Sequence, residues 1–194
     1  LHDAACAAWS IKRYYNGWRP LSAIRHCGGL GQSSDSSLPS YHTNGLPLVT
    51  NLIELVTIDT VTEGRHAGLT PGKIAVFSWP GQPEFPDTET SGVRWVHAED
   101  WMTYQKKTFV TPAFPGYISG HSTFSRSAAE AMTAFTGSKW FPHGLGTYTL
   151  PSLVNEVGPT QPVTLQWASY YDAADQVGLS RIWGGIHPPA DDFP

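Results

Sequence analysis

Two short segments of the chain combine residue types that suit an anion. Lys12 and Arg19 lie seven positions apart, nearly two helical turns, so both project from one side of a continuous helix. Ser119, Gly120 and His121 stand directly before a run rich in Ala, Met and Phe that is typical of a helix. A serine N-cap and free backbone N–H groups at a helix start suit a phosphate-like oxyanion, and a histidine beside them titrates near neutral pH. Together they indicate an anion site with an acid–base group.

A third segment, LSRIWGGIHPPADD at residues 179–192, adds another cation and another histidine. Arg181 falls at the close of a long helical pattern, and His187 follows two glycines. Pro188 favours an extended backbone at His187, so its ring need not follow the helix face. Each segment taken singly has a simpler interpretation: an exposed basic helix face, an ordinary capped helix, or a loop.

Helical patterns dominate the elements that would position these residues. Apolar residues recur at helical spacing over residues 3–17, 119–136 and 163–183. Residues 49–64 fit a helix or a buried strand, and an asparagine followed three positions later by a glutamate favours the helix. Residues 73–81 have the composition of a short strand. We therefore predict an all-α fold, a helical bundle with long irregular loops.

Composition narrows the classes of protein. The 194 residues include 12 basic and 16 acidic side chains, giving a formal net charge of -4 with no Lys/Arg block, which argues against a nucleic-acid binder. No apolar run is long enough to span a membrane. Cys6 and Cys27 lack the spacing of a zinc or redox motif. The length predicts a single catalytic domain over residues 1–194. Because the sequence opens inside a helical pattern, we expect it to be the C-terminal portion of a larger protein.

Read in order, the three segments resemble the signature of the superfamily of vanadium-dependent haloperoxidases and type-2 phosphatidic-acid phosphatases. Lys12 and Arg19-Pro20 fit K-x-x-x-x-x-x-R-P, and residues 119–121 fit P-S-G-H except at the first position, where Ile118 stands. Residues 180–191 fit S-R-x-x-x-x-x-H-x-x-x-D. The match runs through nearly the whole chain and is closer to the soluble vanadium haloperoxidases. The resemblance implies their helical bundle.

The resemblance also implies roles. The residues expected to hold the equatorial oxygens of vanadate, or of a substrate phosphate, are Lys12, Arg19, Ser119, Gly120 and Arg181. His187 would bind vanadium axially, or attack phosphorus in a phosphatase. His121 would be the acid–base group near the opposite apical oxygen. Asp191 would orient His187, but two prolines lie between them, so Asp192 is an alternative partner.

Two aromatic residues bear on the choice between the two chemistries. Trp9 and Phe114 resemble the aromatic pair of the halide pocket in soluble chloroperoxidases, and ordinary core packing explains them equally well. The implied reaction uses vanadate as cofactor and hydrogen peroxide, halide and a small organic acceptor as partners, with hypohalous acid as product. His121 would accept a proton from peroxide while Lys12 polarises it. The alternatives are a soluble acid phosphatase that forms a phosphohistidine at His187, and a non-catalytic homologue.

The remaining expectations are general. Six further histidines show no metal-ligand spacing and are expected at the surface or in the core: His2, His26, His42, His66, His97 and His143. Relatives are often exported, so we expect a secreted or periplasmic protein, although the sequence shows no signal peptide. A homo-oligomer is left open.

Overall fold

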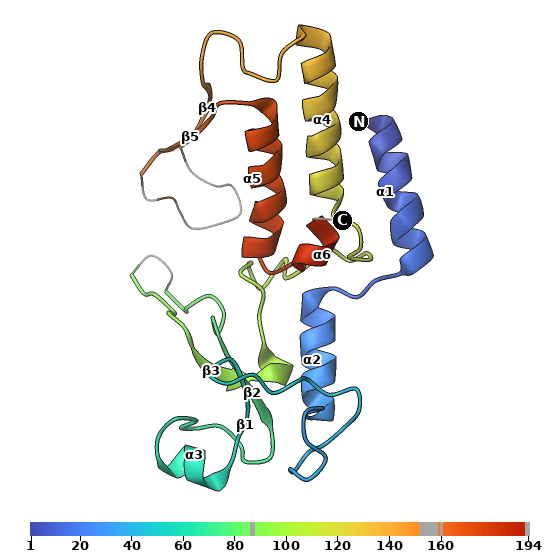
Figure 1. The fold of residues 1–194 in the computed structure, drawn as a ribbon. Helices are drawn as coiled ribbons and strands as arrows, with labels where there is room; N and C mark the ends of the chain where they lie inside the picture. Colours follow the sequence, from blue (N-terminus) through green and yellow to red (C-terminus); the bar gives the residue numbers. More distant parts are fainter. Residues whose placement is uncertain (86–87, 152–158, 160, 193–194) are drawn as a thin grey trace. The chain divides into compact units, whose positions relative to one another are not determined.

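The computed structural model describes residues 1–85, 88–151, 159 and 161–192, and the chain divides into two compact units (Figure 1). Residues 1–19 and 112–194 form the first unit, and residues 20–111 form the second. The first unit therefore combines both ends of the sequence. The single catalytic domain over residues 1–194 stays a prediction.

The first unit is built on three long helices. Helix α1 spans His2–Tyr15, α4 spans Gly120–Thr136 and α5 spans Tyr170–Trp183. Figure 1 shows α4 running beside both α1 and α5, and α4 packs against each of them. The short helix α6, Pro189–Asp192, follows α5 and packs against it.

Small side chains allow the helices of this unit to approach closely. Ala129 of α4 is buried with Tyr170 and Ala174 of α5, and Phe141 and Tyr171 pack around them. This contact fixes α5 against α4, so the end of α5 and the start of α4 keep a defined spacing.

The second unit contains a three-stranded antiparallel sheet in the order β1-β2-β3. Its elements are α2 (Pro20–Leu30), β1 (Ile53–Leu55), α3 (Ile58–Thr62), β2 (Ile74–Ser78), β3 (Arg94–His97) and the 3-10 helix η1 (Ala98–Asp100). Ile74, Val76 and Ala98 form its buried core. The strand predicted at residues 73–81 is therefore present as β2.

The prediction of an all-α fold is wrong. Within the described residues the chain has two antiparallel sheets, so its fold is mixed α/β. The second sheet pairs β4 (Gly146–Leu150) with β5 (Val163–Trp167) in the first unit. Residues 163–167 read V-T-L-Q-W, an alternation of apolar and polar residues that suits a half-exposed strand. The predicted helix over residues 163–183 is therefore wrong at its start, because the apolar spacing of a five-residue run fits a strand as well as a helix.

The predicted helix over residues 49–64 is wrong for a related reason. Strand β1 and the short helix α3 occupy this stretch. The Asn51 N–H donates to the Glu54 side chain at 2.8 Å, as a capping pair would, but Asn51 has a left-handed φ of 63°. The pair therefore closes a turn that leads into a strand.

Helix α4 forms where the sequence predicts it. Ser119 is the N-cap with extended backbone angles, and its Oγ accepts a hydrogen bond from the Ser122 N–H. Gly137 ends the helix with a φ of 70°, which glycine adopts without a steric penalty. No helix in the described part of the chain is long and apolar enough to cross a membrane.

Candidate oxyanion site

The start of α4 is the centre of the candidate site. Ser119 is completely buried, and its backbone N–H donates to the Asp191 carbonyl oxygen at 2.8 Å. A Cβ built on Gly120 would lie 3.9 Å from Cε of Lys12, so the Lys12 side chain runs alongside the first turn of α4. Segments that are more than a hundred residues apart in sequence thus meet at this helix start.

Lys12 reaches this point from α1. Its side chain is 2% exposed, and Nζ donates to the carbonyl oxygens of Pro115 at 2.9 Å and Gly116 at 2.7 Å. Burial, followed by the positive charge of Arg19, lowers the pKa of Lys12 from 10.5 to about 8, and Asp191 opposes the change. Two of its three N–H groups are held by backbone, which leaves one for a ligand.

Arg19 contacts the segment before α4 and the segment after α5. Its Nε donates to the Phe114 carbonyl oxygen at 2.9 Å, and Nη1 donates to the Ile186 carbonyl oxygen at 3.0 Å and to Nε2 of His187 at 2.8 Å. Burial, opposed by Asp191 and assisted by Arg181, lowers the pKa of Arg19 from 12.5 to about 10. The guanidinium is therefore charged at neutral pH.

His187 is held in one tautomer. Its ring is 4% exposed, Nδ1 lies 2.7 Å from Oδ2 of Asp191, and Nε2 faces the Arg19 guanidinium. Because a guanidinium can only donate, Nε2 must be the accepting nitrogen and Nδ1 must carry the proton. Burial, then Arg19 and Lys12, lower the pKa of His187 from 6.5 to about 3. The ring is therefore neutral, with a lone pair on Nε2.

Asp191 is the partner of His187, as the signature implies, and Asp192 is not. Pro189 begins α6, where its missing N–H removes no helical hydrogen bond. The Asp191 N–H then donates to the Pro188 carbonyl oxygen at 3.0 Å. The two prolines thus start the turn that brings the Asp191 carboxylate to Nδ1 of His187. Burial raises the pKa of Asp191, and Lys12 and Arg19 oppose the rise.

Arg181 and His121 complete the charged set. Arg181 lies in the last turn of α5, and burial lowers its pKa. The His121 side chain is exposed in the first turn of α4. Partial desolvation, followed by the positive charges of Arg181 and Arg19, lowers the pKa of His121. A neutral His121 can accept a proton near neutral pH.

The donors of this cluster fit a tetrahedral or trigonal-bipyramidal oxyanion. Nη2 of Arg19 and Nε of Arg181 are buried and have no hydrogen-bond partner among the described residues. Buried N–H groups that stay unpaired are costly, and guanidinium groups bind phosphate-like oxygens through several parallel hydrogen bonds. Three cations around one neutral imidazole therefore match vanadate or phosphate in charge and in hydrogen bonding.

Trp9 and Phe114 stand together beside Lys12. Their ring centroids are 4.8 Å apart in an edge-to-face arrangement, and Nζ of Lys12 lies 5.6 Å from the Trp9 centroid and 5.4 Å from that of Phe114. The Arg19 guanidinium lies 5.0 Å from the Phe114 centroid. Both rings are about half exposed, at 47% and 45%, so they border the cluster rather than forming a core.

Sequence reasoning missed three contributions to this cluster. The carbonyl oxygens of Pro115 and Gly116 hold Lys12, and backbone groups carry no signal in the residue types. The third is a link between Ser122 and Asp192, whose side chains are hydrogen bonded. The serine three positions after the N-cap and the second of two consecutive aspartates were its available signals.

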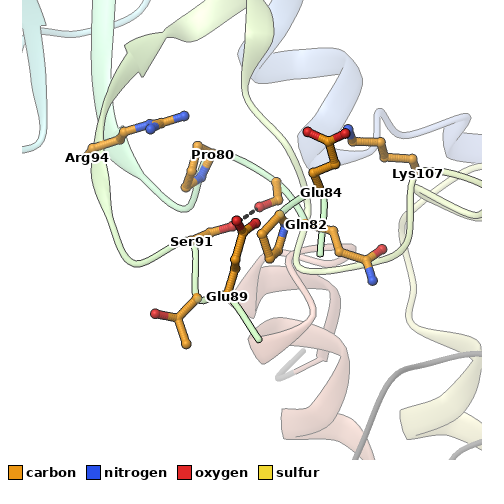
Figure 2. Close-up of a pocket in the computed structure, with 10 residues that line it drawn as sticks. Pro80, Gln82, Glu84, Glu89, Ser91, Arg94 and Lys107 are labelled. Carbon is orange, nitrogen blue, oxygen red and sulfur yellow. Dashed lines mark hydrogen bonds between the residues drawn. The ribbon is translucent and has the colours of Figure 1, made fainter. Parts of the chain in front are cut away.

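Outside this cluster, the described residues include a polar pocket but no set of side chains placed to hold a metal ion. No set of three His, Cys, Asp or Glu side chains placed to hold a metal ion is found there. The second unit has a polar pocket, shown in Figure 2, where Ser91 Oγ donates to the Gly81 carbonyl oxygen at 2.5 Å. None of the residues predicted for the anion site lines this pocket, whose charged members are Glu84, Glu89, Arg94 and Lys107.

Comparison with known proteins identifies the family of the chain. The family model of the VCPO second helical-bundle domain matches residues 68–193. The chain therefore belongs to this vanadium haloperoxidase-type family. No curated protein matches the sequence.

Solved structures of bacterial vanadium-dependent chloroperoxidase share the fold. The apo-type crystal structure superposes with a TM-score of 0.60 at 19% identity, covering 98% of this chain and 30% of that one. The holo-type structure gives 0.58 at 18% identity, covering 96% and 28%. The chain thus spans less than a third of these proteins.

Proposed function

We propose that the cluster binds vanadate and that the protein oxidises halide with hydrogen peroxide to hypohalous acid, which halogenates small organic acceptors. The observation that carries the proposal is the environment of His187. Its Nδ1 proton is held by Asp191 at 2.7 Å, its Nε2 lone pair faces Arg19 at 2.8 Å, and unpaired guanidinium N–H groups of Arg19 and Arg181 lie buried in the same unit.

His187 would hold the oxyanion from one side. When vanadate is bound, it supplies an electrophilic centre that activates hydrogen peroxide toward halide. For that, Nε2 of His187 gives up the hydrogen bond from Arg19 and offers its lone pair, while Asp191 keeps Nδ1 protonated. The freed Arg19 N–H groups turn to the oxygens of the anion, where Arg181 also donates.

Proton transfer would fall to His121. Its lowered pKa leaves the ring neutral and able to accept a proton from peroxide, and its exposure gives that proton a route to solvent. Lys12 has one N–H group that is not held by backbone, and this group would polarise the bound peroxide.

Two aromatic rings support halide oxidation over phosphate hydrolysis. Trp9 and Phe114 border the ammonium group of Lys12, so they form a partly apolar, partly positive edge. The Lys12 ammonium group and the positively polarised edges of the two rings can attract a large, weakly hydrated anion such as bromide. The hydrolysis of a phosphate monoester has no evident use for such an attraction.

The proposal is tested by measuring two activities on one preparation. Bromination of a dye with peroxide and bromide should require added vanadate, and hydrolysis of p-nitrophenyl phosphate should be weak. His187→Ala should reduce bromination by more than about a hundredfold, because the lone pair that holds the anion is lost. His2→Ala, an exposed histidine of α1, is the matched control and should keep full activity.

Two outcomes would contradict this proposal. Strong vanadate-independent phosphate hydrolysis with no bromination, abolished by His187→Ala, would identify an acid phosphatase that forms a phosphohistidine. If neither activity appears and neither vanadate nor phosphate raises the unfolding temperature, the chain is a non-catalytic homologue.

A further inference from the structure

Three consecutive backbone carbonyl groups, shortly before α4, hold two cations of the site. Nε of Arg19 donates to the carbonyl oxygen of Phe114 at 2.9 Å. Nζ of Lys12 donates to the next two carbonyl oxygens, those of Pro115 at 2.9 Å and Gly116 at 2.7 Å. These contacts use only main-chain atoms, so they set no requirement on the side chains of the segment.

Gly116, the last residue of this segment, is buried and lies against two oxygens of its neighbours. A Cβ built on it would lie 3.0 Å from Oδ2 of Asp191 and 3.0 Å from the Trp18 carbonyl oxygen. Cβ atoms seldom come so close to other atoms in a packed interior, so a neighbour would have to move. The Gly116 N–H donates to the Gly17 carbonyl oxygen at 2.9 Å, which ties the two main-chain segments together. The carboxylate is therefore the group that would be displaced.

Close approach, rather than backbone conformation, is what requires a glycine at this position. Gly116 does not belong to the glycines with a positive φ, so its backbone angles are open to other residues. The Asp191 oxygen that a Cβ would meet, Oδ2, is also the atom that lies 2.7 Å from Nδ1 of His187. A displacement of this oxygen therefore acts directly on the imidazole ring.

We propose that Gly116 is a positioning residue of the oxyanion site, because its missing side chain lets Asp191 hold His187 with the Nε2 lone pair presented to the anion. A shift of Oδ2 by a few tenths of an ångström lengthens and bends the hydrogen bond to Nδ1, and hydrogen bonds weaken steeply with such changes. The inference rests on the proposed function, in which this lone pair binds vanadate. Gly116 itself contributes no reacting atom.

The first measurement is proton NMR of the 194-residue chain, labelled with nitrogen isotope at histidine and without added ligand. The Nδ1 proton of His187 should resonate far downfield, and its absence from His187→Gln identifies it. Gly116→Ala should move this signal upfield, because the carboxylate that accepts the proton is displaced. Gly29→Ala is the matched control and should leave the signal unchanged, since a Cβ on Gly29 meets only Oε2 of Glu99, at 3.8 Å.

The second measurement compares vanadate with inorganic phosphate by calorimetric titration. In the proposed function vanadate is held by the cations and by Nε2 of His187, whereas phosphate at equilibrium relies on the cations. Gly116→Ala should therefore weaken vanadate binding by about threefold to tenfold, the range of one weakened hydrogen bond to a charged group, and phosphate binding much less. A purely structural role would weaken both alike. Gly29→Ala should leave both affinities unchanged.

A double variant tests whether the effect passes through the carboxylate. Asp191→Ala removes the group that the new methyl would meet, so adding Gly116→Ala to it should change vanadate affinity very little. Residues in contact show such non-additive effects, whereas independent sites add. Thermal unfolding shows whether each variant folds. If Gly116→Ala alone does not fold, the double variant should fold again, because the methyl group then has room.

The outcomes separate this inference from the proposed function. An unchanged Nδ1 proton signal in Gly116→Ala, or an equal loss for vanadate and phosphate, overturns the inference and leaves the proposed function standing. A double variant in which the two losses add, or in which folding is not restored, also overturns it. If wild type binds neither vanadate nor phosphate, the proposed function fails, and the NMR comparison still decides whether Gly116 positions His187.

Discussion

Acid should weaken the native fold through His187, and replacing this one side chain should remove much of the effect. Burial, followed by the charges of Arg19 and Lys12, lowers the pKa of His187 from 6.5 to about 3. Between these values the unfolded chain binds a proton that the native protein does not bind at this site. The free energy of unfolding therefore includes a contribution that is complete above pH 6.5 and is lost as the pH falls toward 3.

The size of this contribution follows from the two pKa values. A pH of about 5 is roughly 1.5 units below the pKa of a histidine in the unfolded chain, and each unit corresponds to about 1.4 kcal/mol of unfolding free energy. Since His187 is only 4% exposed, solvent screens little of the effect. Moving from about pH 7 to about pH 5 should cost about 2 kcal/mol through this residue.

The measurement is urea denaturation followed by the fluorescence of the eight tryptophans. Wild type should lose about 2 kcal/mol more than His187→Gln between the two pH values. His121→Gln is the comparison variant from the same cluster. The pKa of His121 is also lowered, but water screens its exposed ring, so this variant should remove much less of the loss than His187→Gln. If His187→Gln loses as much stability as wild type, the ring is not held neutral and the reasoning about its tautomer fails.

Two further predictions concern packing and charge. Gly178→Ala should lower the free energy of unfolding by about 1–3 kcal/mol, because the new methyl group meets the carboxylate of Asp192; an unchanged urea midpoint would contradict this packing. Phosphate affinity should fall as the pH rises through about 8, where Lys12 loses its proton, and Lys12→Arg should move this loss to higher pH. Calorimetric titrations with phosphate at several pH values measure the loss. If the affinity of Lys12→Arg falls at the same pH as that of wild type, Lys12 is not its cause.

The sequence contains most of what is needed to predict α4, the helix whose start lies at the centre of the site. Serine at a helix start and glycine just after its end mark α4, because each answers a local backbone requirement. The cations follow from residue type, but the helical spacing predicted for Lys12 and Arg19 is wrong, because α1 ends at Tyr15 and Arg19 lies in the segment after it. Their meeting in one unit depends on α4 packing against α1 and α5, which no local pattern encodes.

The strands were the part of the fold that local patterns could not resolve. Residues 163–167 pair with 146–150, and this pairing decides their conformation. A five-residue run shows nearly the same apolar spacing in a strand and in a helix. The choice of Asp191 over Asp192 as the partner of His187 is local by contrast, because the two residues lie only four positions apart. It depends on where α6 begins, and Pro189 suits the first position of that helix.

The contact between Arg19 and His187 has a consequence for ions of the opposite sign. Histidine is usually an excellent ligand for divalent zinc or copper. Here the lone pair on Nε2 is held by a guanidinium at 2.8 Å, with Lys12 and Arg181 contributing further positive charge. An incoming cation would have to displace Arg19 and then remain beside it. An incoming oxyanion gives Arg19 a new partner as it leaves the ring. The Arg19 guanidinium therefore disfavours the binding of metal cations to Nε2 of His187 and favours the binding of anions.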